Sequence, residues 1–170
     1  IDSGLITEYT NPIWQYRIYY PATWQVGEVD KEYKQVIFSA VTGDYIEVLV
    51  FQKNDGEKFV DWFVRKGTNQ KITDLQTFQN SFQESGQRRQ DNLVNYFERD
   101  NNVYVIIYHP VSENGFVSFR HIVQMSVQSF RSKKTQISLP EQTILPPSLT
   151  EKEIEEIFVG SENSTSSNNI

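Results

Sequence analysis

Residue types that bind transition metals are scarce in this sequence. A transition-metal site needs clustered imidazole, thiolate or carboxylate ligands. The sequence has two histidines, His109 and His121, and no cysteine. Their spacing is not of the HxxxH type that places two imidazoles on one face of a helix. His109 ends a predicted strand and His121 lies on the outer face of a predicted helix. We therefore expect no tightly bound transition metal and no cofactor.

Carboxylates and hydroxyls give little further indication of a metal site or a catalytic site. Asp44 and Glu47 flank a predicted turn and could contribute to a calcium site, but the spacing of an EF-hand loop is absent and surface charge is the more ordinary interpretation. A nucleophilic serine needs a nearby base. Neither GxSxG nor SxxK occurs, and Ser118 stands three residues before His121 on one predicted helix, which is uninformative. We expect no catalytic site, and hence a protein that is not an enzyme.

Composition limits the partners. The 170 residues carry a formal net charge of -6, with an isoelectric point near 5.0. Nucleic acid and anionic membrane surfaces bind basic patches, so neither is expected as the main partner. No apolar run approaches the roughly 20 residues that span a bilayer. We expect membrane association only through an anchor upstream of Ile1, if there is one.

The elements that must position any site are mainly strands. Residues 92–110 predict a hairpin that turns at Asp100-Asn101-Asn102, since Asn and Asp tolerate tight turns. Its second arm, 103–108, is apolar on both faces, as is 45–51 apart from Glu47, and both are predicted to be interior strands. Residues 34–40 pair with 45–51 in a second predicted hairpin. Residues 71–89 fit either a Gln-rich helix or a strand.

Two amphipathic helices are predicted beside these strands. Asp55 is the expected N-cap of the first helix, and Gly67 is the expected C-terminal stop. The second covers 116–130, where apolar residues recur at helical spacing. Strands and helices in this order predict an α+β fold with an antiparallel sheet.

Aromatic residues gather between Trp14 and Val26. Trp14, Tyr20 and Trp24 are expected to fill one end of the core, because aromatic side chains bury large areas. The alternative is an aromatic cleft at Trp14, Tyr19 and Trp24 that binds a ligand.

The character of the chain changes after the second helix. We predict a domain over 1–131, a proline-containing linker or arm over 132–147, a short amphipathic helix over 148–159 and a flexible Ser/Asn-rich tail over 160–170. Ser148 and Glu151 match a capping box. Ile154, Ile157 and Phe158 share one face of a helix too short to be stable alone. These three residues are candidates for binding a partner, including a second copy of the chain.

Three motifs resemble the PsbP-like family. They are the YPxxW sequence at Tyr20–Trp24, the strand pair NYFERDNNVYVIIYHP, and the helix end SVQSFR with Ser129 and Phe130. The resemblance covers roughly 9–131. It implies the Mog1/PsbP-like α/β/α sandwich, in which an antiparallel sheet has helices on both faces, and it favours a strand within 71–89. The tail after Arg131 makes the chain more similar to exported bacterial PsbP-like domains than to the photosystem II subunit.

The resemblance implies a non-enzymatic, exported accessory domain that binds a protein at a membrane or cell envelope. Its location would be extracytoplasmic, with a lipid anchor upstream if there is one, or the thylakoid lumen in a photosynthetic organism. One alternative is an extrinsic photosystem II-type assembly or stabilising protein. A less favoured alternative is a hydrolase or small-ligand-binding protein that uses the aromatic cleft.

Overall fold

A computed structural model of the protein describes residues 5–67, 69–111 and 113–132, with the backbone alone for 113–119. The described elements run as follows: β1 (Ile6–Thr10), β2 (Arg17–Pro21), β3 (Gln25–Glu28), β4 (Gln35–Ser39), β5 (Tyr45–Gln52), α1 (Phe59–Arg65), the 3-10 turn η2 (Ile72–Asp74), β6 (Gln76–Gln79), β7 (Ser85–Arg88), β8 (Val94–Arg99), β9 (Asn102–His109) and α2 (Glu113–Ser129). Apart from Ser132, the predicted linker lies outside the described residues, as do the predicted short helix and tail.

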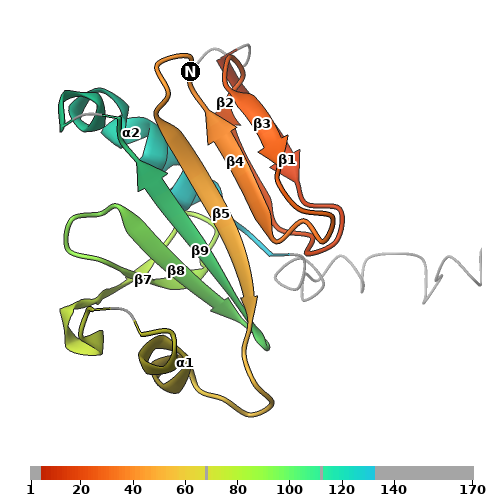
Figure 1. Ribbon diagram of the computed structural model, residues 1–170, viewed down its shortest axis with the longest axis vertical. Helices are drawn as coiled ribbons and strands as arrows, with labels where there is room; N and C mark the ends of the chain where they lie inside the picture. The colour runs from red at the N-terminus through yellow and green to blue at the C-terminus, as the bar shows by residue number, and fades with distance from the viewer. Residues whose placement is uncertain (1–4, 68, 112, 133–170) are drawn as a thin grey trace, which may run out of the picture. The chain divides into compact units, whose positions relative to one another are not determined.

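Seven of the strands form one sheet. Their order is β3-β4-β5-β9-β8-β7-β6, and every neighbouring pair is antiparallel. Strands β1 and β2 pair separately as a two-stranded ribbon. Figure 1 shows β5 and β9 crossing the middle of the molecule as the longest strands. The prediction that these two segments are interior strands is confirmed, since each has a strand on both sides.

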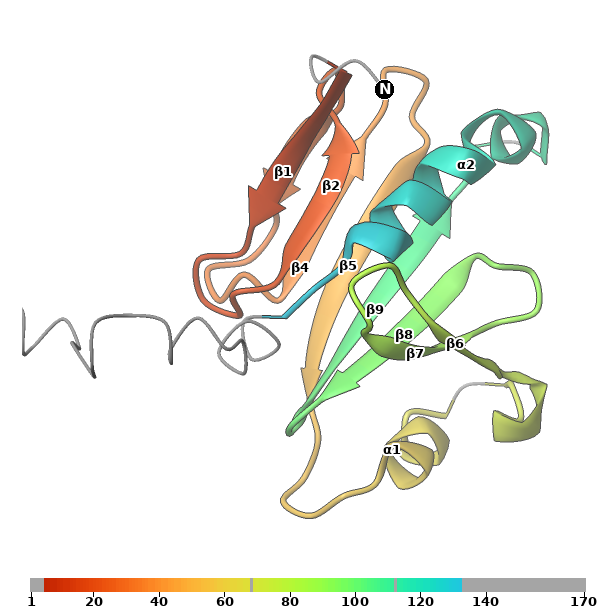
Figure 2. The same ribbon diagram turned by 180° about the vertical axis from the view of Figure 1, so that it is seen from behind.

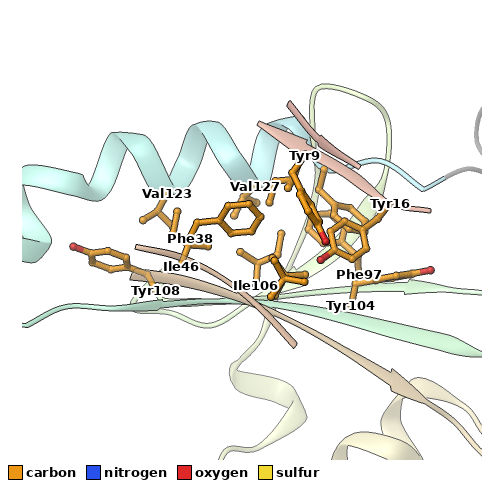
Figure 3. Close-up of a cluster of buried hydrophobic side chains, with 14 of the residues drawn as sticks. Tyr9, Tyr16, Phe38, Ile46, Phe97, Tyr104, Ile106, Tyr108, Val123 and Val127 are labelled. Atoms are coloured by element: carbon orange, nitrogen blue, oxygen red, sulfur yellow. The ribbon is translucent and has the colours of Figure 1, made fainter. Parts of the chain in front are cut away.

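Side-chain alternation divides the core into two clusters, one on each face of the sheet. On the first face, Ile46, Val48 and Ile106 pack against α2 and the β1–β2 ribbon. Figure 2 shows α2 lying along this face, and Figure 3 shows Val123 and Val127 of α2 above the strand residues. On the second face, Val103, Val105 and their neighbours pack against Trp62 and Phe63 of α1. The predicted antiparallel sheet with helices on both faces is confirmed.

Several local predictions are refined by the structure. The β8–β9 hairpin turns through Asp100, whose φ of 55° is left-handed. Residues 71–89 contain β6 and β7, so the strand interpretation is correct. Helix α1 ends as predicted, with Gly67 at φ 67° and its N–H bonded to the Val64 carbonyl.

The predicted start of each helix is wrong. Helix α1 begins at Phe59, because Gly56 has a φ of 74° and holds the preceding residues in a turn. Lys58, not Asp55, occupies the N-cap, and its side chain makes no capping hydrogen bond. Helix α2 begins at Glu113, three residues before the predicted start.

Candidate binding face of the β-sheet

The two faces of the sheet are covered unequally. At about 1.5 Å per residue, the 17 residues of α2 extend about 25 Å and the seven of α1 about 10 Å. Seven strands spaced about 4.8 Å apart make a sheet almost 30 Å across. The first face has α2 and a β-ribbon over it. On the second face the short α1 packs on Val94, Tyr96, Val103 and Val105, and the ring of its Trp62 also lies 5.5 Å from the Phe51 ring, centroid to centroid.

At the margin of the cluster that contains α1, the second face presents side chains that are only half-buried. Three apolar ones are Leu49, Phe51 and Ile107. Strand pairing places Tyr45 opposite His109 and Glu47 opposite Ile107 at the end farther from α1. We call the surface formed by Tyr45, Glu47, Leu49, Phe51, Ile107 and His109 the open face.

A groove of about 490 Å³ follows the open face along α1. Its floor comes from Leu49, Val105 and Ile107, and Trp62 of α1 forms one wall. A second hollow of about 490 Å³ shares Leu49, Phe51 and Lys66 with it and reaches Gln35 of β4. The apolar floor therefore continues across β4, β5 and β9, which suits an elongated ligand better than a compact one.

A carboxylate and an imidazole form the polar end of the open face. Glu47 Oε1 lies 2.9 Å from His109 Nε2, and Glu47 Oε2 accepts a hydrogen bond of 2.5 Å from Gln35 Nε2. The Tyr45 ring stacks on the His109 ring, with centroids 4.3 Å apart and planes at 17°. Both oxygens of this mostly buried carboxylate are therefore occupied, which explains how an apolar strand accommodates a glutamate.

Two cationic side chains, Arg89 and Lys66, also line the groove. Arg89 is already paired with Asp91, with Nη2 and Oδ2 2.7 Å apart. Lys66 follows α1, and its ammonium lies 4.6 Å from the centre of the Phe51 ring. Within residues 5–67, 69–111 and 113–132, no carboxylate lies within ion-pair distance of Lys66. Lys66 is thus available to an anionic group of a ligand.

Helix α1 is fixed in place by polar contacts at its start. Glu57 accepts two hydrogen bonds of 2.9 Å from Arg65 and one of 3.0 Å from the Asn54 amide. The Arg65 hydrogen bond is the main reason that the pKa of Glu57 falls to about 2. The Lys53 ammonium reaches Glu98 of β8 at 2.5 Å. These contacts hold the helix that carries Trp62 and leads to Lys66.

His109 and Glu47 resemble the base and orienting carboxylate of a catalytic triad. In the part of the chain that the structure describes, however, none of the residues lining the groove is Ser, Thr or Cys. Among the described residues, the lining of the groove therefore offers this base no serine, threonine or cysteine nucleophile.

The structure separates the two residue pairs that were considered as weak metal-site candidates, His109 with His121 and Asp44 with Glu47. His109 lines the groove on the second face, whereas exposed His121 lies on α2, which covers the first. Asp44 bonds to the hydroxyl of Tyr108, a side chain of the first-face cluster, so it does not join Glu47. No group of three or more His, Cys, Asp or Glu suited to a metal ion occurs among the described residues.

The aromatic residues near the N-terminus lie in different surroundings. Trp24 is 8% exposed within the first-face cluster, and Trp14 and Tyr20 pack against that cluster, as the core interpretation predicts. Trp14 also donates from Nε1 to the Glu32 carbonyl at 2.9 Å. Tyr19 lies beneath the guanidinium of Arg131, 5.1 Å from ring centre to Cζ. Ile154, Ile157 and Phe158 lie outside the described residues.

Sequence reasoning missed the open face, although one signal pointed to it. Glu47 is the only charged residue in 45–51, and an isolated charge in an interior strand needs a partner on the same face. The antiparallel register between the two predicted interior strands supplies His109 as that partner. No comparable signal in the sequence indicated that Leu49 and Ile107 are partly exposed, because their exposure depends on the short length of α1.

The fold defines the class of protein, an antiparallel α/β/α sandwich, and solved structures make it more specific. The solution structure of cyanobacterial PsbP (CyanoP) from Synechocystis sp. PCC 6803 matches 78% of this chain and 95% of its own, with a TM-score of 0.51 and 11% identity. A crystal structure from Bacteroides thetaiotaomicron VPI-5482 matches 74% of this chain with a TM-score of 0.52 and 10% identity. This chain covers only 48% of that protein.

The chain therefore has a PsbP-like fold, as its motifs predicted. At 10–11% identity the likeness concerns the fold alone. No protein-family model and no curated protein matches the sequence. Among the described helices, none is both long and apolar enough to cross a membrane.

Proposed function

We propose that this protein is a non-enzymatic accessory domain that binds another polypeptide through the open face of its sheet. The observation that carries the proposal is the unequal covering of the two faces, which leaves Leu49, Phe51 and Ile107 half-buried around a groove. Completing the burial of such side chains contributes on the order of 1 kcal/mol each. Well-packed side chains near the centre of an interface carry most of its binding energy.

The proposal includes a location outside the cytoplasm, at a membrane or cell envelope. Its support is the PsbP-like fold together with the family motifs in the sequence. Fractionation of the source cells, followed by detection of the native protein, tests this part separately. Recovery in the cytosolic fraction would overturn export while leaving the binding face untouched.

The alternative functions have weaker support. A role as an extrinsic photosystem II-type protein rests on the fold shared with a cyanobacterial PsbP, and on no surface feature of this chain. A hydrolase of the catalytic-triad type would use His109 and Glu47, but the described lining of the groove provides no serine, threonine or cysteine beside them. The accessory-domain function needs only the groove that is present.

Site-specific photocrosslinking tests the binding function. A photoreactive amino acid replaces Leu49 on the open face in one sample and Val41, which is 101% exposed on the β4–β5 turn, in the other. In the source cells we expect a discrete protein adduct from position 49 that Lys66→Glu weakens, and none from position 41. Equal labelling at both positions, or no adduct at position 49, would refute the proposed face.

A further inference from the structure

The chemistry of the open face indicates what kind of ligand it binds. An occupant must offer apolar side chains to Leu49 and Ile107 and a negative charge to Lys66. It must also be elongated, because the groove and the adjoining hollow continue across several strands. A short acidic, amphipathic peptide segment meets these three requirements.

The chain itself contains such a segment. Residues 148–159 read SLTEKEIEEIFV, with four glutamates and one lysine. The helix predicted for this segment places Ile154, Ile157 and Phe158 on one face, flanked by glutamates. Twelve residues are at the lower limit for a helix that is stable alone, so the segment needs a surface on which to dock.

We propose that the open face receives residues 148–159 of a second copy of the chain, so that the protein self-associates by exchanging these segments. The proposal rests on the binding function proposed above and identifies its partner. Exchange between two copies forms the same contact twice around a two-fold axis, and two weak contacts together support a closed dimer.

The point where the described chain ends favours a second copy over the same molecule. Arg131 forms a β-bridge with Arg17 of the ribbon, and its guanidinium bonds to Glu8 at 2.7 Å. The Ser132 amide donates to the buried Glu84 carboxylate at 2.9 Å. The ribbon and α2 both cover the first face, so Ser132 is held on that side of the sheet. The open face is on the other side and can be approached directly by a neighbouring molecule.

Complementation between two variants of the full chain tests the inference. Lys66→Glu damages the face and leaves the segment intact. Ile157→Glu combined with Phe158→Glu damages the segment and leaves the face intact. Mass is measured by sedimentation equilibrium, and thermal unfolding verifies that each variant is folded. The matched control is Lys71→Glu, which reverses the charge of an exposed lysine that does not line the groove.

We expect the unaltered chain to be dimeric and to dissociate on dilution, with weaker association at higher salt. Lys66→Glu should weaken association on the order of tenfold, equivalent to about 1.4 kcal/mol, while Lys71→Glu should leave it unchanged. At the same total concentration, an equal mixture of the face variant and the segment variant should show a higher average mass than either variant alone, because only a mixed dimer joins an intact face to an intact segment.

Two results would overturn self-association. The unaltered chain could be monomeric at every concentration, or the mixture could contain no mixed dimer. If Leu49 crosslinks to a different protein in cells while the purified chain is monomeric, the accessory function stands and the second-copy partner is refuted. If neither adduct nor dimer forms, both proposals fail.

Discussion

Replacement of Asn80 by alanine is the sharpest test of how the domain is held together. This buried side chain follows β6 and is 5% exposed. Its Nδ2 donates to the carbonyls of Val127 at 3.0 Å and Phe130 at 2.7 Å, at the end of α2. Its Oδ1 accepts from the amides of Phe82 and Glu84, both at 3.0 Å. One residue therefore joins the β6–β7 turn to the helix that covers the first face.

The magnitude follows from the four backbone groups that Asn80→Ala leaves without this partner. A buried orphan group costs about 1–3 kcal/mol. Phe82 is 38% exposed, so water can reach its amide, and the Val127 carbonyl keeps a bond from the Phe130 amide at 3.3 Å. The Glu84 amide and the Phe130 carbonyl then account for most of the loss, about 3 kcal/mol in total.

Urea unfolding followed by tryptophan fluorescence measures this loss. The midpoint should fall while the slope stays unchanged, which indicates lost stability without a change in the unfolded state. The matched control is Gln79→Ala, which removes an exposed neighbour whose hydrogen bond is longer, at 3.3 Å. It should change stability by less than about 0.5 kcal/mol. A loss below about 1 kcal/mol for Asn80→Ala would refute the reasoning, since the orphaned groups would have found other partners.

Three further variants test the packing and electrostatics of the sheet. Ile106→Ala should cost about 2–5 kcal/mol by leaving a cavity in a fully buried site, and equal urea midpoints would contradict this. Gly86→Ala should cost about 1–3 kcal/mol, because the new Cβ would lie 2.9 Å from the fixed Tyr96 carbonyl oxygen, and an unchanged melting temperature would contradict it. The Arg65 hydrogen bond lowers the pKa of Glu57 from 4.5 to about 2, so its stabilising effect is complete above pH 4.5 and disappears as the pH falls toward 2. Glu57→Gln should therefore flatten the pH dependence of the urea midpoint in that window, and an unaltered dependence would show that the contact does not form.

The sheet could be predicted from the sequence because its signals are local. Residues 103–108 are apolar on both faces, and only an interior strand of a sheet covered on both sides buries such a run. The turn at Asp100 follows from the tolerance of aspartate for left-handed backbone angles. These features need no knowledge of distant residues, and the family motifs then indicated how the strands are arranged.

The beginning of α1 and the β6–β7 region illustrate where local signals fail. Asp55 is a good N-cap by residue type, yet Gly56 adopts a left-handed angle and the helix starts at Phe59. Two of the four residues 76–79 are glutamine, which is a good helix former and is not enriched in strands. They form a strand because β7 pairs with them across the register of Phe78 and Gly86. Tertiary pairing, which one segment cannot reveal, decided the outcome.

The open face consists of strand residues that no described helix covers fully, and the sequence pattern did not reveal this. Leu49 and Ile107 have the same residue types as fully buried strand positions, so composition assigns them to the core. Both are half-buried beside α1, which has only seven helical residues and ends just before Gly67. Under the self-association proposed above, an apolar floor with Lys66 at its side favours a segment that is both apolar and acidic, and it disfavours a basic or wholly polar one.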